Sequence, residues 1–514
     1  MARVGKNLLE SVTRSMYKDS KCVYREYIQN AADQIDTARK LRPDLDYNVY
    51  VTIEQQLKRI TIEDNATGVR ADSVRALLID VACSEKVRGV NKGFRGIGRL
   101  GGLAYCKTLK FETSYFDEDI VSIVTWDAVR LTQILDDNND DSEVGEVIDS
   151  ITQITVKKDD SYKEKHYFKV IMEDVTDEKL LVEKDIRDYL SMVSPVDYSN
   201  HFVFRRKIYD FMKEHNLHLD CYNIFVGDTQ IFKDYTMSFV AKQMEDDISG
   251  VDFFYQTNNL GVPIYWGWYS ISHLRGIIKN HNAANIRLRC ENIQLGDETT
   301  CYKFMTNGDK HRFVRYFFGE INVLPSSKLV PNSDRDYLRE DDGLKEFENL
   351  VEKDFLKLEK LCYLASGLRT ENETIRRKDA EKKSIEEKLS KGVVSEESKE
   401  KLQKSWIKLQ EDRQKAYAKL AKLQQEMQKS NSPLLMLQPI NATPILTSTS
   451  KTEQPTNPSY VIASGLRTDN VGYNKFNARE KKLILTIYNV IDQTLNNEKE
   501  REALIDKIEK EITK

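Results

Sequence analysis

The stretch YREYIQNAADQID at positions 24–36 constrains the fold of this chain more than any other. Its pattern predicts a helix on which Glu26, Asn30 and Asp33 follow i, i+4, i+7 spacing and form one polar stripe between apolar flanks. Three polar groups that face an otherwise apolar interior are costly unless something fills the space between them. Either a ligand fills that space, or the stripe is the solvated face of an amphipathic helix.

The residue types on this stripe suit a metal-bound nucleotide. Glu26 can orient or deprotonate a water molecule, and Asn30 can offer its carbonyl oxygen to Mg²⁺. Mg²⁺ prefers oxygen ligands and usually takes few of them from protein, because phosphates and waters complete its octahedron. A buried stripe therefore predicts a nucleotide with its metal as the ligand.

A second candidate position follows two predicted strands. Residues 48–54 and 59–63 alternate and are rich in β-branched side chains, which predicts a hairpin that runs into IEDNATGV. Asp64 would stand at a strand end, where a carboxylate can accept a hydrogen bond from an adenine amino group. Gly68 would let the backbone pass close to a ring. The same spacing is also common in ordinary turns, so this segment alone leaves both interpretations open.

Glycine clusters most densely at positions 89–102, after a predicted helix at 71–80. There GFRGIG runs directly into an apolar helical stretch. The backbone N–H groups of such a loop, with the helix N-terminus after it, form an anion cradle, and neighbouring basic side chains add charge for phosphates. The residues predicted to contact the nucleotide here are Lys86, Lys92, Gly93, Gly96 and Gly98. The segment is not a P-loop, because no GK[ST] follows.

Four strand-like runs follow the glycine-rich segment, at 107–113, 120–126, 129–135 and 150–158. Thr152 in the last run would lie beside Asp64 if these strands form one sheet. Two helices are predicted before the first hairpin, at 7–17 and 19–40.

The composition narrows the class of protein. A chain of 514 residues predicts two to four domains of about 150 residues each. The net charge of −4 argues against a strongly basic protein that wraps nucleic acid. The seven cysteines are scattered without a CxxC pair, which predicts reduced thiols in a cytoplasmic protein. Neither a secretory signal nor an apolar run of about 18 residues is found, so no membrane span is predicted.

Residues 1–175 resemble the GHKL ATPases, a superfamily that includes DNA gyrase, the ninety-kilodalton heat-shock chaperones, sensor histidine kinases and MutL. YREYIQNAADQID resembles the first box of that family. The resemblance implies that Glu26 is the general base, that Asn30 is the Mg²⁺ ligand and that Asp33 is the neighbouring carboxylate. It also implies an α/β sandwich that binds ATP and Mg²⁺ under a mobile lid.

Three further segments carry the resemblance. IEDNATGV is similar to the box in which Asp64 would bind adenine and Gly68 would be the second glycine, with Ala66 in place of the first. SEK at 84–86 followed by GFRGIG resembles the lid of MutL and MORC proteins. Thr152 fits the final threonine box, although an isoleucine replaces the usual glycine before it.

Residues 176–350 resemble the α+β transducer domain of the heat-shock, MutL and MORC branches. Strand-like runs recur there, at 222–228, 251–256, 262–271, 285–295 and 315–324. LPSSKLVPNSDRDYL then resembles the chaperones' LPLNxSRE segment, in which an arginine reaches the γ-phosphate of ATP, and Arg335 is the matching position. Arginine suits that role because it stays charged and donates two parallel hydrogen bonds. The alternative is a surface arginine in a capped turn.

The rest of the sequence predicts helices and a flexible linker. In residues 351–430 the apolar positions from Leu402 to Met427 alternate spacings of four and three, which predicts a heptad seam. Gly392 is predicted to break an earlier helix, so a helical hairpin or coiled coil follows, within one chain or between chains. Residues 431–470 read as a flexible linker, and 471–514 as amphipathic helices.

The expected fold class is therefore α+β: a GHKL sandwich, a transducer-like domain and a helical C-terminal region. The first function hypothesis is a Mg²⁺-dependent ATPase switch in which ATP orders the lid, pairs two chains as a homodimer and gates a partner protein or DNA. A chaperone-like client remodeller and a non-hydrolysing ATP-sensing scaffold are the alternatives. A MORC- or MutL-like role would place the switch in prokaryotic defence or genome maintenance.

Overall fold

A computed structural model describes most of the chain in two compact units, Met1–Arg369 and Thr370–Lys514. The described residues are 5–6, 9–10, 13, 19–81, 98–305, 307–332, 334–390, 396–440 and single positions or short runs between 483 and 511. The predictions for Lys86, Lys92, Gly93 and Gly96 lie outside these residues, as do most of those for the helices at 7–17 and 471–514. Among the described helices, none combines the length and the apolar character needed to cross a membrane.

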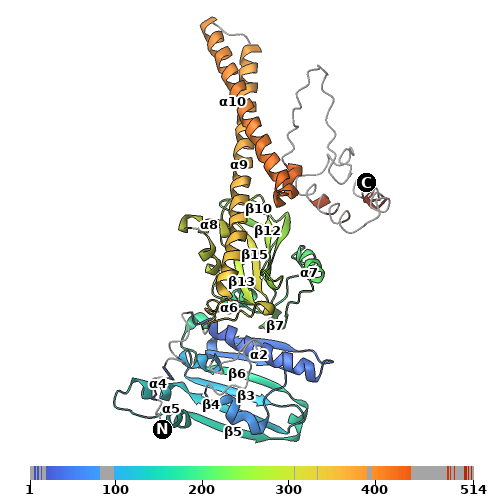
Figure 1. The fold of residues 1–514 in the computed structure, drawn as a ribbon. Helices are drawn as coiled ribbons and strands as arrows, with labels where there is room; N and C mark the ends of the chain where they lie inside the picture. The colour runs from blue at the N-terminus through green and yellow to red at the C-terminus, as the bar shows by residue number, and fades with distance from the viewer. Residues whose placement is uncertain are drawn as a thin grey trace. The chain divides into compact units, whose positions relative to one another are not determined.

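An eight-stranded sheet forms the first part of the first unit (Figure 1). Its order is β5-β4-β3-β6-β2-β1-β7-β8, and every neighbouring pair is antiparallel except β1 with β7. The strands are β1 (Asn48–Glu54), β2 (Arg59–Asp64), β3 (Thr108–Ser114), β4 (Ile120–Asp127), β5 (Thr152–Lys158), β6 (Tyr167–Glu173), β7 (Asn223–Val226) and β8 (Thr229–Gln230). The predicted first hairpin is confirmed. The sheet also takes two strands from beyond residue 175, and the domain boundary at that position stays a prediction.

Helices cover one face of this sheet. They are α2 (Cys22–Leu41), α3 (Val74–Leu78), α4 (Ala128–Asp136) and α5 (Val144–Ile151). Strand side chains alternate between faces, so Ile60, Ile62 and Asp64 of β2 are buried while Glu63 turns to the other face. Apolar residues of α2, including Tyr24 and Ile28, share one core with these strands. Because Glu26, Asn30 and Asp33 lie about half a helical turn around α2 from Tyr24 and Ile28, the polar stripe faces away from this apolar contact with the sheet.

One predicted strand, at 129–135, is wrong. These residues lie in α4, because the Asp127 carboxylate accepts a hydrogen bond from the Arg130 backbone N–H and caps a helix there. A second predicted strand, at 150–158, begins only at Thr152. Its first two residues end α5, which starts in a capping box between Glu143 and Glu146. A short run of alternating apolar residues fits a strand and a short helix equally well, and the caps decide between them.

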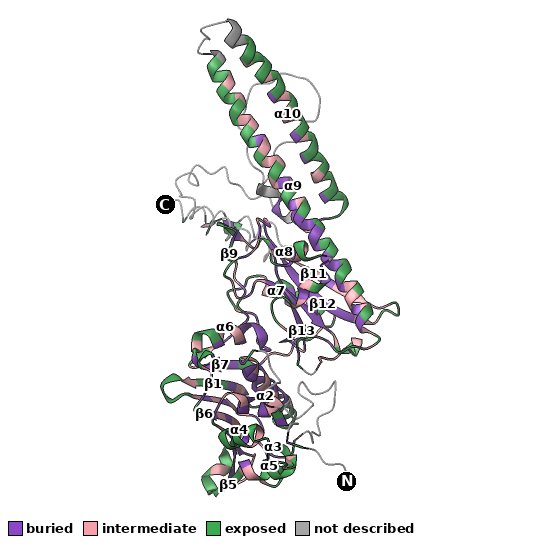
Figure 2. Ribbon diagram, turned by 90° about the vertical axis from the view of Figure 1, so that its left-hand side faces the viewer, coloured by how far each residue is buried: buried purple, intermediate pink, exposed green. Residues whose placement is uncertain are grey.

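A second sheet follows in the same unit, with the order β11-β12-β15-β13-β14. Its strands are β11 (Gly250–Thr257), β12 (Pro263–Ile271), β13 (Asn285–Cys290), β14 (Ile293–Gln294) and β15 (Phe318–Val323), and β12, β13 and β15 are almost entirely buried (Figure 2). A small hairpin of β9 (Ser238–Ala241) and β10 (Met244–Asp247) lies apart from it. In sequence, the helices α6 (Glu183–Val193) and α7 (Arg205–Glu214) come before the second sheet. The short α8 (His311–Val314) lies between β14 and β15, and α9 (Leu344–Ser390) comes after β15. The run predicted at 285–295 divides into β13 and β14 because Glu291 and Asn292 form a two-residue turn with φ of 52° and 62°.

The second unit contains the end of α9 and the helix α10 (Glu396–Lys429), which run antiparallel. Three ion pairs join them: Lys419–Glu371, Lys378–Asp412 and Arg413–Asp379. Four positions of the predicted seam are buried: Leu409, Ala416, Leu420 and Met427. Arg413 interrupts the seam in sequence and makes one of the ion pairs. The two helices therefore pair within one chain, and a coiled coil between chains stays a prediction. The predicted linker is described only as far as η9 (Pro433–Ile440).

Candidate functional site

The polar stripe of α2 is largely withdrawn from solvent. Asp33 is buried, the Glu26 side chain is 14% exposed, and Asn30 is half-buried. The stripe is therefore not a solvated helix face. Burying carboxylate and amide oxygens costs free energy unless hydrogen bonds, ion pairs or a ligand satisfy them.

Tyr27 holds the end of the glycine-rich stretch against α2. Its hydroxyl donates to the Arg99 carbonyl at 3.0 Å and accepts from the Gly102 N–H at 3.0 Å. Burial raises the pKa of Tyr27, so the hydroxyl keeps the proton that it donates. These bonds fix η3 (Gly98–Ala104), and with it Gly98, beside the helix that carries Glu26.

Asp64 and Gly68 shape the loop after β2. The Asp64 side chain is buried, and its Oδ1 accepts from the Ala66 N–H at 3.1 Å. Gly68 has φ of +68°, and a Cβ there would lie 1.9 Å from the Ser114 carbonyl oxygen, so only glycine fits. The Thr67 hydroxyl then donates to Gln34 on α2 at 3.0 Å. The loop is thus tied to the stripe-bearing helix.

Thr152 does not lie beside Asp64, which corrects the prediction. β5 is the edge strand, and β4, β3 and β6 separate it from β2. The Thr152 hydroxyl instead donates to the Ile148 carbonyl at the end of α5. The strand beside Asp64 is β6, which pairs Phe168 with Asp64 and follows His166, whose Nδ1 lies 2.8 Å from the Ala66 carbonyl oxygen. The apolar residues that recur in HYFKVIME (166–173) were the available signal for this strand.

Arg335 comes from the second sheet region to meet Glu26. Its Nε lies 4.0 Å from Glu26 Oε1, and its own side chain is 10% exposed. Arg335 has φ of 53°, and its carbonyl accepts from the Gly296 N–H at 2.8 Å. It is therefore a buried residue in a tight turn, unlike the surface arginine of the alternative interpretation.

Arg25 is a site residue that the sequence patterns did not indicate. Its Nη2 lies 3.9 Å from Glu26 Oε1 and donates to the Asp334 carbonyl at 3.4 Å. Two guanidinium groups, Arg25 and Arg335, thus flank one carboxylate. Together with the 334–335 backbone they bring the two sheet regions into contact at Glu26.

Comparison with known proteins identifies the first region. The family described as "Histidine kinase-, DNA gyrase B-, and HSP90-like ATPase" matches residues 19–160. Residues 19–160 form a GHKL-type ATPase domain. The match includes α2, Asp64 and Gly68 and ends before Arg335.

Two curated relatives resemble the GHKL domain. The chaperone protein HtpG of Psychrobacter cryohalolentis and that of Psychrobacter arcticus are each 27% identical over 139 residues, which cover 23% of this chain and 21% of the relative. The chain therefore spans about a fifth of the length of these relatives.

The described residues of the GHKL domain fit a magnesium nucleotide. Asn30 and Glu26 offer oxygen atoms from one half-buried helix face, and oxygen is the ligand type that Mg²⁺ prefers. Asp64 offers a buried acceptor at the end of a neighbouring strand. Asn30 would hold the metal, and Asp64 would face the base.

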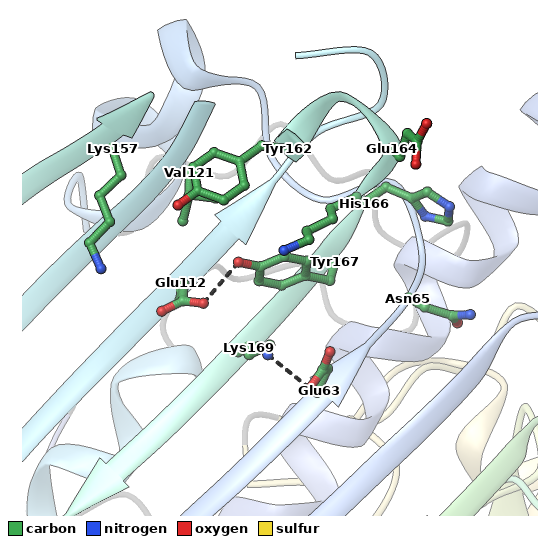
Figure 3. Close-up of a pocket in the computed structure, with 11 residues that line it drawn as sticks. Glu63, Asn65, Glu112, Val121, Lys157, Tyr162, Glu164, His166, Tyr167 and Lys169 are labelled. Carbon is green, nitrogen blue, oxygen red and sulfur yellow. Dashed lines mark hydrogen bonds and ion pairs between the residues drawn. The ribbon is translucent and has the colours of Figure 1, made fainter. Parts of the chain in front are cut away.

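The GHKL domain also has a polar pocket of about 590 Å³ on the sheet face opposite α2 (Figure 3). Within it Tyr167 donates to Glu112 at 2.8 Å, and Lys169 lies 3.2 Å from Glu63. Burial, with the Glu112 carboxylate beside it, raises the pKa of Tyr167. None of the described candidate residues lines this pocket, so it is distinct from the candidate site at α2.

Proposed function

We propose that this chain is a Mg²⁺-dependent ATPase whose GHKL domain binds the nucleotide and whose second sheet region supplies Arg335. Asp64 accepts a hydrogen bond from the adenine amino group, and Gly68 gives the ring room. Asn30 holds Mg²⁺, with Asp33 as the neighbouring carboxylate. Lys86, Lys92 and the glycines at 93, 96 and 98 contact the phosphates. Bound Mg²⁺ would neutralise phosphate charge and orient the nucleotide.

Hydrolysis in this proposal depends on two side chains. The Glu26 carboxylate orients the attacking water and takes its proton. The Arg335 guanidinium donates to the γ-phosphoryl oxygens and stabilises the charge that develops on them. Arg25 holds the Asp334 carbonyl next to this arginine and keeps a second positive charge beside Glu26.

One observation carries the proposal: Arg335 Nε lies 4.0 Å from Glu26 Oε1 across two sheet regions. A left-handed backbone conformation costs a non-glycine residue about 1 kcal/mol or more. The turn accepts that cost at Arg335 and aims the side chain at the stripe of α2. The closeness of Arg335 to Glu26 supports the proposal that this arginine completes the ATPase site.

Replacing Arg335 with alanine tests this role. We expect kcat to fall by about 10²-fold or more, because one positioned donor to the transition state is lost, while ATP affinity changes little. Phosphate release and calorimetric titration on the same preparation measure the two quantities. Arg339→Ala is the matched control, because Arg339 is exposed and lies near the end of the same turn. A wild-type rate in Arg335→Ala would refute the role.

We propose that the ATPase is a conformational switch. ATP orders the glycine-rich lid and pairs two chains as a cytoplasmic homodimer, and hydrolysis releases them. The similarity to HtpG favours a chaperone-like action on a partner protein over the clamping of DNA. ATP-dependent suppression of aggregation of a denatured protein would support that choice. ATPase stimulation by DNA with a steep salt dependence would overturn it, and tight ATP binding without phosphate release would indicate a sensing scaffold.

A further inference from the structure

The second sheet contains a fully buried charge cluster centred on Glu320 of β15. Glu320 accepts hydrogen bonds from Tyr198 at 2.6 Å, from Tyr235 at 3.0 Å and from Lys233 at 3.0 Å, and Arg289 Nε lies 2.9 Å from it. Burial lowers the pKa of Lys233 to about 8, and the Glu320 carboxylate opposes that shift. Buried charges persist only where partners satisfy them, so this cluster holds its members in fixed positions.

Arg289 also joins this cluster to the end of α6, which precedes the second sheet in the chain. Its Nη2 donates to the Met192 carbonyl at 2.6 Å, near the end of α6, and its Nη1 donates to the Asn292 carbonyl at 3.0 Å. The first bond reaches the helix that leaves the GHKL domain. The second holds the turn between β13 and β14.

Asn292, in the turn between β13 and β14, also donates hydrogen bonds to the segment after α6. Its side-chain amide donates to the Asp220 carbonyl at 2.7 Å and to the Val196 carbonyl at 3.3 Å. Asn292 is 2% exposed, so no solvent competes for these bonds. Arg289 and Asn292 therefore fix the β13–β14 turn against three backbone carbonyls of residues 192–220.

The residues joined by these contacts lead on one side to Arg335 and on the other side to the helix that carries Glu26. Beyond β14, the Gly296 N–H donates to the Arg335 carbonyl at 2.8 Å. A Cβ at Gly296 would lie 2.5 Å from the Asp336 carbonyl oxygen, so the segment after β14 fits closely against the turn that bears Arg335. On the other side, the α6 residue Tyr189 lies beside Cys22, at the start of the helix that carries Glu26.

We propose that Arg289 and Asn292 are positioning residues for ATP hydrolysis. They set the spacing between α6 and the turn that bears Arg335, and through it the approach of Arg335 to Glu26. Both act through Arg335 and touch no reacting atom. This inference rests on the proposed function.

Asn292→Gly is a specific test. Glycine adopts positive φ without strain, so the two-residue turn keeps its backbone conformation. The side-chain amide that donates to the Val196 and Asp220 carbonyls is lost. We expect kcat to fall by about 10-fold, the effect of a small displacement of Arg335, with ATP affinity within about 2-fold of wild type. Glu291→Gly is the matched control, because it places glycine at the neighbouring position of the same turn. Its rate should stay near that of wild type.

A double-mutant cycle separates positioning from general stability. If Asn292 acts through Arg335, the variant carrying both Asn292→Gly and Arg335→Ala hydrolyses ATP at the rate of Arg335→Ala alone. Arg289→Lys, which keeps the charge beside Glu320, should follow the same pattern. Additive losses, a normal rate in Asn292→Gly, or a loss that Glu291→Gly shares would overturn this inference and leave the ATPase assignment intact. Absence of ATPase activity in the folded wild-type chain would overturn both.

Discussion

Replacing Glu26 with glutamine is expected to lower kcat for ATP hydrolysis by about 10²-fold or more, the usual contribution of a general base. Glutamine keeps the shape of the side chain but cannot take a proton from water. ATP binding should survive, because the proposed adenine and metal contacts come from Asp64 and Asn30. Phosphate release measured beside calorimetric ATP titration separates the two effects. Glu26→Ala should behave in the same way.

The matched control for Glu26 lies on the same helix. The Asp36 carboxylate accepts a hydrogen bond from the Tyr222 hydroxyl at 2.7 Å. The amide oxygen of Asp36→Asn can keep that bond, so this variant should hydrolyse ATP at nearly the wild-type rate. Undiminished turnover in Glu26→Gln would remove Glu26 from the mechanism.

The second large effect is expected in binding. Asp64→Asn should weaken ATP affinity by at least ~30-fold, the equivalent of about 2 kcal/mol for a lost charged hydrogen bond to the adenine amino group. The loop should survive, because the asparagine oxygen can still accept from the Ala66 N–H. Calorimetric titration of the variant with ATP measures the loss.

Glu63→Gln is the control for Asp64. Glu63 is the preceding residue of β2, but its side chain faces the opposite side of the sheet and lies 3.2 Å from Lys169. Its loss should leave ATP affinity unchanged. Equal losses in Glu63→Gln and Asp64→Asn would show that the strand is merely disturbed, and would contradict a contact between Asp64 and the base.

The sequence was most informative where local pattern and fold agree. The stripe of α2 and the hairpin of β1 and β2 follow from residue spacing, because helices and strands have different periods. The family resemblance of this region is confirmed by the match over residues 19–160. The roles of the individual site residues stay predictions, because spacing fixes where a side chain lies on its element and not what it binds.

The failures occurred where distant segments decide the structure. Thr152 was misplaced because consecutive strands do not form consecutive neighbours, and β6 inserts beside Asp64 from later in the chain. Arg25 was missed because tertiary packing sets its contact with the Asp334 carbonyl and brings Arg335 to the same Glu26 carboxylate. One failure was local instead: the Asp127 carboxylate accepts a hydrogen bond from the Arg130 backbone N–H, and this cap begins α4 in a run predicted as a strand. Arg335 was found by its resemblance to a known segment, which periodicity alone would not have identified.

Isothermal titration of the full chain with ATP, with and without Mg²⁺, tests the nucleotide site most directly. We predict saturable binding of one ATP per chain, stronger with Mg²⁺ because Asn30 and the phosphates share the ion in the proposed site. Asp64→Asn in the same titration should give much weaker binding. A well-folded preparation that takes up no adenine nucleotide in the presence of magnesium would contradict the site at α2 and, with it, the role of Arg335.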